Sequence, residues 1–129
     1  MCFKILQKNY PVSIVILRIA IAGVFLAHGY MKFSNFDSLP TLMKILAIAE
    51  PLGGIAMLIG LLTRWAALGL SIIMLGAIYM KITAMGIGYT GGPGAGWEFD
   101  LLILASCIMM MTMGAGKYSL DAMIGWDRA

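Results

Sequence analysis

The sequence predicts an all-α integral membrane protein built as a four-helix bundle. Of its 129 residues, 61% are hydrophobic and only 12% are charged, and the mean hydropathy is +0.93. A soluble domain is nearer half apolar and a quarter charged. The apolar residues form four long runs, and each run is close to the roughly 20 residues that a helix needs to cross a bilayer. We therefore expect one membrane domain over residues 1–129.

The first span is expected at residues 11–33. Pro11 suits the first turn of a helix, and Tyr10 suits the headgroup layer. Two lysines precede the apolar run, as they do in a secretory signal peptide. Arg18 lies inside the run, however, and no small-residue cleavage site leads into a polar chain. We expect this helix to stay in the protein.

The second and third spans are expected at residues 42–62 and 65–82. A polar stretch that contains Pro40 precedes the second span. The short polar and aromatic segment 63–65 joins the two spans. The third run ends near Lys81.

The fourth span is expected at residues 97–114. Residues 86–96 contain six glycines and Pro93, which is the composition of a loop. Gly114 and Gly116 close the fourth run. Ser119 is a suitable N-cap for a short surface helix over about 119–126.

Four spans place both termini on one side of the membrane, and we expect that side to be the cytoplasm. Cytoplasmic loops carry an excess of Lys and Arg. Five basic residues lie on the side of the termini: Lys4, Lys8, Arg64, Lys117 and Arg128. Three lie on the other side: Lys32, Lys44 and Lys81. The sequence thus predicts a multi-pass protein of the cell membrane.

Composition also excludes several classes of function. Nine Lys and Arg against six Asp and Glu give a net charge of +3, which is too small and too scattered for a nucleic-acid partner. Cys2 and Cys107 are too few for a disulfide scaffold or an iron–sulfur cluster. The only histidine is His28. We expect neither a metal site nor an intrinsic cofactor.

Ionisable residues inside the spans are the candidate functional groups, because each costs about 2.5–3.5 kcal/mol near the bilayer centre unless it is paired or hydrated. Arg18, Phe25 and Lys32 follow a seven-residue repeat with Ala22 and Gly29, so they should share one helix face. From their depths, Arg18 and Glu50 are expected to pair. Gly69 and Gly76 are expected to form a close-packing stripe.

A second group of charges should gather near the outer surface. His28 and Lys32 end the first span, Lys81 ends the third, and Glu98 and Asp100 begin the fourth. The two acids also suit the first turn of a helix, where the macrodipole favours anions. A purely structural role for these charges therefore remains open, as it does for Arg18 and Glu50.

Three segments of the sequence carry short motifs. The first helix contains Leu17 and Arg18, and residues 25–32 read FLAHGYMK. Residues 50–54 read EPLGG and residues 60–64 read GLLTR. Glu98 begins the last span, and residues 114–121 read GAGKYSLD. In this order and spacing the motifs resemble those of the DoxX family, and they extend from Leu17 to Asp121, so the resemblance covers nearly the whole chain.

The resemblance implies a four-helix membrane subunit that is similar to the membrane part of thiosulfate:quinone oxidoreductases. A quinone needs an apolar slot, donors to its oxygens and a proton relay. Arg18, His28, Lys32 and Lys81 are the candidate ligand-binding residues, and Glu50 and Glu98 are the candidate proton relays. The sequence shows no electron carrier, so we expect a subunit that needs partners rather than a complete enzyme. The alternative is a non-catalytic accessory subunit of a larger respiratory or oxygenase complex; a transporter ranks last.

Overall fold

The computed structural model describes residues 2–126 and shows an all-α protein, as predicted. The six α-helices and one 3-10 helix of this part of the chain are α1 (Cys2–Lys8), α2 (Tyr10–Phe33), η1 (Phe36–Ser38), α3 (Thr41–Ile59), α4 (Thr63–Thr83), α5 (Trp97–Met113) and α6 (Leu120–Met123). Within it, α2, α3 and α4 are long and apolar enough to cross a membrane. The fourth expected span corresponds to α5, which has 17 residues. Arg128, counted above for orientation, lies outside the described residues, and the orientation stays a prediction.

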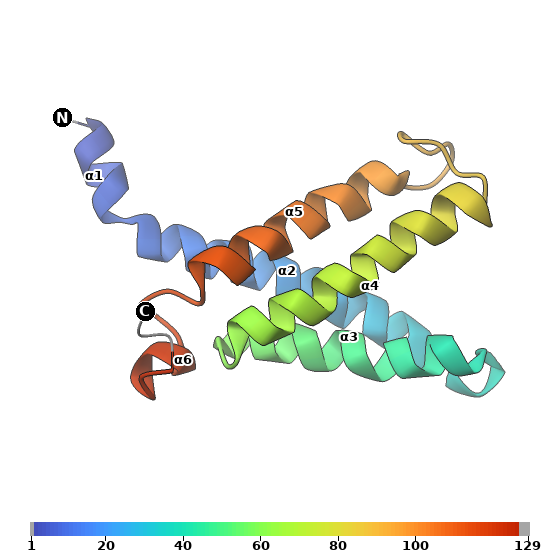
Figure 1. The fold of residues 1–129 in the computed structure, drawn as a ribbon, viewed down its shortest axis with the longest axis horizontal. Coiled ribbons are helices and arrows are strands. Elements are labelled where there is room, and N and C mark those ends of the chain that lie inside the picture. Colours follow the sequence, from blue (N-terminus) through green and yellow to red (C-terminus); the bar gives the residue numbers. More distant parts are fainter. Residues whose placement is uncertain (1, 127–129) are drawn as a thin grey trace.

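The long helices form two hairpins, α2 with α3 and α4 with α5, which pack against each other (Figure 1). In Figure 1 the hairpins lie together near the ends that carry the chain termini, and they diverge toward their connecting loops. The core between them is apolar, with Phe25, Met57, Leu70 and Met110 fully buried. The helix α1 projects from the start of α2, and none of its residues is buried.

Glycines allow the first hairpin to pack closely. A Cβ atom at Gly29 of α2 would overlap the ring of Pro51 in α3. A Cβ at Gly54 would lie 3.2–3.4 Å from side chains and backbone of α2. Small residues let helix backbones approach one another in membranes. The shared face expected for α2 is confirmed, since Arg18, Ala22, Phe25 and Gly29 are all buried.

The glycine stripe expected on the third span is not packed against another helix in the described part of the chain. Gly69 and Gly76 are exposed on α4, and nothing lies within 4 Å of a Cβ built at either position. In their place, Leu70 and Met74 face the core. A seven-residue glycine spacing marks one helix face but does not say which face turns inward.

The connection between α3 and α4 occupies residues 60–62, three residues earlier than the expected segment 63–65. Gly60 ends α3 in the left-handed conformation, with φ of 72°. Leu62 also has a positive φ, 49°, which is uncommon for a branched residue. The C-terminal segment supports this turn, since Asp121 accepts hydrogen bonds from the backbone N–H groups of Leu62 and Thr63 at 2.7 and 2.9 Å. The short helix α6 has Ser119 as its N-cap, which accepts from Ala122 N–H.

Candidate functional site

The buried charges gather at two separate places along the bundle. One lies around Arg18, beside the end of α3 and the segment that follows α5, and the other lies near the opposite end of the bundle, around Lys32 and Lys81. Arg18 and Lys32 are 14 residues apart on α2, which is about 21 Å along a helix. The two groups of buried charges are therefore separate in space.

Arg18 lies at the first of these places, where it joins three segments of the chain. Its guanidinium donates to four backbone carbonyls: Met57 O at 2.9 Å, Leu58 O at 2.8 Å, Ala115 O at 3.1 Å and Tyr118 O at 2.6 Å. Two of these carbonyls end α3, and two belong to the segment between α5 and α6. Arg18 is only 2% exposed, and its donors are used within the protein.

The expected pair of Arg18 with Glu50 is therefore not formed. The depths of the two residues were compatible, but unpaired carbonyls at helix ends also attract a guanidinium. Arg64 has a similar function at the end of α5, where its Nη1 donates to Met111 O and Thr112 O.

The second place is a pocket of about 170 Å³ that all four long helices line. Apolar walls come from Val24 and Phe25 of α2, Met74 and Ala77 of α4, and Phe99 and Ile103 of α5. The polar residues of the pocket are His28, Lys32, Glu50, Lys81 and Asp100. The pocket thus combines a ring-sized apolar space with two carboxylates, two ammonium groups and an imidazole.

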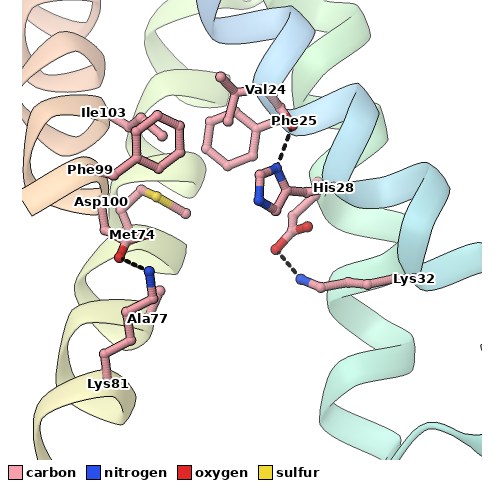
Figure 2. Close-up of a pocket in the computed structure, with 11 residues that line it drawn as sticks. Val24, Phe25, His28, Lys32, Met74, Ala77, Lys81, Phe99, Asp100 and Ile103 are labelled. Atoms are coloured by element: carbon pink, nitrogen blue, oxygen red, sulfur yellow. Dashed lines mark hydrogen bonds and ion pairs between the residues drawn. The ribbon is translucent and has the colours of Figure 1, made fainter. Parts of the chain in front are cut away.

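Two ion pairs belong to this pocket, one on each hairpin. Lys32 Nζ lies 2.5 Å from Glu50 Oε1 and joins α2 to α3. Lys81 Nζ lies 2.6 Å from Asp100 Oδ2 and joins α4 to α5. Figure 2 shows Lys32 on one side of the pocket, and Lys81 with Asp100 on the other. Because each pair is neutral, the pocket carries polar groups without a net charge.

Both carboxylates are more buried than their lysines. The side chains of Glu50 and Asp100 are 4% and 9% exposed, whereas those of Lys32 and Lys81 are 25% and 21% exposed. Glu50 Oε2 is buried, and it has no hydrogen-bond partner within residues 2–126. Asp100 Oδ2 makes its ionic contact with Lys81 but no hydrogen bond in the same part of the chain. Buried acceptors without a hydrogen-bond donor are uncommon in proteins, and a catalytic role or a bound water or ion is among their explanations.

The structure brings together four of the six residues that the sequence singled out, namely His28, Lys32, Glu50 and Lys81. Arg18 lies elsewhere, and Glu98 does not line the pocket. The acid that α5 contributes is Asp100. Positions 98 and 100 differ by about 200° around a helix, so only one of them can face the pocket. The sequence placed both acids in the outer group of charges and gave no signal that favoured Asp100 over Glu98.

Comparison with known proteins places the chain in a family. The profile of the DoxX family matches residues 13–83. The chain belongs to the DoxX family. An uncharacterized membrane protein of Mycobacterium tuberculosis is 32% identical, over 92% of this chain and 85% of that protein. An uncharacterized protein of Haemophilus influenzae is also 32% identical, over 90% of this chain and 93% of its own length.

A third relative carries a functional name. The Bacillus subtilis protein named "Putative oxidoreductase CatD" is 26% identical over 92% of each chain. No solved structure matches the chain. As a DoxX protein the chain is a membrane protein, and the pocket is its candidate functional site.

Proposed function

We propose that this DoxX protein is a membrane subunit of an oxidoreductase and that it binds a quinone-type ring in the pocket. The observation that carries the proposal is the position of two lysine–carboxylate pairs beside an apolar cavity between the two hairpins. The name of the Bacillus subtilis relative supports redox chemistry for the family. The chain's own residues would bind and orient the ring and exchange protons with it.

The size of the cavity suits a single ring. A cavity of about 150 Å³ lined by apolar side chains is known to hold benzene, and this pocket has about 170 Å³. Pockets for whole drug-sized ligands begin at about 300 Å³. The headgroup of a quinone fits, whereas a long apolar tail would have to extend into the bilayer.

The polar groups suit the oxygens of such a ring. An ammonium group has three donors. Lys32 uses one of them on Glu50, and Lys81 makes an ionic contact with Asp100. The remaining donors of Lys32 and Lys81 are available to ring oxygens from two sides of the pocket. Phe25 and Phe99 supply aromatic walls. The buried carboxylate of Glu50 is the group best placed to exchange a proton.

A cavity-filling variant tests the proposal in purified protein reconstituted in lipid nanodiscs. Ala77 lines the pocket, and Gly76 beside it faces away with nothing within 4 Å of its Cβ position. We expect 2-methyl-1,4-benzoquinone to bind the native protein and Gly76→Phe with equal affinity. Ala77→Phe should lose binding, because the added ring occupies the cavity. Absence of binding to the native protein, or equal binding to Ala77→Phe, would contradict the proposal.

The second candidate is an accessory subunit that packs against a larger membrane enzyme. It is favoured by the exposed face of α4, where Gly69 and Gly76 alternate with the large side chains of Trp65 and Ile72. A pull-down in mild detergent distinguishes the two functions. A stoichiometric large partner, together with no quinone binding by the isolated chain, would support the accessory role.

A further inference from the structure

We infer that the pocket favours the reduced, hydroxyl-bearing form of the ring, and that it holds the hydroxyl groups on two acceptors, His28 Nε2 and Glu50 Oε2. This inference rests on the proposed function and adds which redox form the site selects. It comes from the hydrogen-bonding capacity that remains on the α2–α3 side of the pocket.

The first acceptor follows from the tautomer of His28. Its Nδ1 lies 2.9 Å from the backbone oxygen of Val24. A carbonyl oxygen only accepts, so Nδ1 carries the hydrogen, and the neutral ring then has an unprotonated Nε2. Figure 2 shows the imidazole on the pocket wall between Phe25 and Lys32. No other residue within 2–126 bonds to Nε2.

The second acceptor is the free oxygen of Glu50. Lys32 occupies Oε1, and Oε2 is buried without a partner in the described chain. A buried acceptor without a donor carries an uncompensated desolvation free energy, and a hydrogen bond from a ligand hydroxyl offsets it. His28 follows Phe25 on α2, Glu50 lies on α3, and both line the same pocket. One side of the pocket therefore presents two acceptors that lack donors.

The two redox forms of a quinone differ in what they offer to these acceptors. A hydroquinone has two O–H donors, whereas a quinone has only acceptor oxygens. Lys32 and Lys81 can donate to the oxygens of either form, so they explain binding of the ring but not a choice between forms. With His28 Nε2 unprotonated and Glu50 ionised, both atoms only accept hydrogen bonds, so in these states they bond to the reduced form alone. Sites built to bond a hydroxyl discriminate strongly against the analogue that lacks it.

Anaerobic titration calorimetry on the protein in nanodiscs tests this inference, with 2-methyl-1,4-benzoquinone and its hydroquinone as the two probes. The native protein should bind the hydroquinone at least about tenfold more tightly than the quinone. His28→Phe should weaken hydroquinone binding about tenfold and leave the affinity for the quinone unchanged. His28 is exposed, so this variant should fold. Tyr30→Phe, at an exposed residue of α2 outside the pocket, is the matched control and should bind both probes like the native protein.

Glu50→Gln gives a second readout that a purely structural role would not produce. The new amide can donate to a quinone oxygen, so the preference between the two forms should shift toward the quinone. Equal binding of the two forms by the native protein, or tighter binding of the quinone, would overturn the inference and leave the proposed function intact. Failure of both forms to bind would overturn the two together. An unchanged ratio in His28→Phe would also overturn the inference.

Discussion

Lys32 Nζ lies 2.5 Å from Glu50 Oε1, so one ion pair joins the last turn of α2 to the middle of α3. The lysine extends from near the helix end to a carboxylate that is almost fully buried. Long basic side chains bridge such differences in depth, since their stems lie along apolar surface. The pair therefore sets both the packing of the first hairpin and the polarity of one side of the pocket.

Removal of one partner of this ion pair should lower the free energy of unfolding more than removal of both partners. Lys32→Met leaves the buried Glu50 carboxylate without its cation, which should lower the free energy of unfolding by about 1–3 kcal/mol. The double variant Lys32→Met/Glu50→Gln should recover much of that loss, because no buried charge is left unpaired. Denaturant titrations in detergent micelles measure both. A double variant that is no more stable than Lys32→Met would contradict the pairing.

Arg18 is expected to determine stability and not ligand binding. Its guanidinium bonds to four carbonyls, and a lysine has no planar fork with which to reproduce them. Arg18→Lys should lower the unfolding free energy by about 2–4 kcal/mol, as expected when buried acceptors lose their donors. Thermal unfolding in detergent measures this, with Lys44→Met as the control at a lysine outside the pocket. Loss of quinone binding in a folded Arg18→Lys variant would contradict the claim that Arg18 lies apart from the ligand pocket.

Two glycines should respond in opposite ways to the same substitution. A Cβ at Gly29 overlaps Pro51, so Gly29→Ala should destabilise by about 1–3 kcal/mol. A Cβ at Gly76 meets nothing within 4 Å, so Gly76→Ala should be neutral or stabilise the helix by up to about 1 kcal/mol. Unfolding of the two variants under one condition provides the comparison. Equal effects would show that α2 and α3 do not pack as described.

Asp121 should act as a cap for the turn before α4. It is 2% exposed and accepts from two backbone N–H groups, one of them on Leu62 with its positive φ. Asp121→Ala should lower the free energy of unfolding by about 1–2 kcal/mol, the usual range for loss of a helix cap. Asp37→Ala, at an exposed acid of η1, is the matched control and should have little effect. Comparable losses in the two variants would show that the C-terminal segment is not anchored through Asp121.

The fold class followed from the sequence because hydropathy and length identify spans directly. Apolar runs near 20 residues have few alternatives to membrane helices. The helix boundaries were predicted less accurately, since the left-handed residues Gly60 and Leu62 place the link between α3 and α4 inside the apolar run rather than after it. The helix α1 was not expected, because Lys4 and Lys8 were interpreted only as a charged flank.

The candidate site was predictable only in part. The sequence placed His28, Lys32, Glu50 and Lys81 among the important charges, because ions within spans must find partners. It could not identify the partner of Arg18, since the carbonyls that accept its hydrogen bonds exist at every residue and become available only at particular helix ends. It also could not choose Asp100 over Glu98, because that choice depends on the rotation of α5 about its axis.

Photoaffinity labelling tests the central claim, that the pocket between the hairpins is where a ring ligand binds. The protein in nanodiscs would be irradiated with an azido-1,4-benzoquinone and digested, and the adducts would be mapped by mass spectrometry. We expect adducts concentrated on residues 24–32 and 97–103, and their suppression by excess unlabelled quinone or by Ala77→Phe. Adducts spread evenly over the lipid-facing side chains, or centred on the segment around Arg18, would contradict the account.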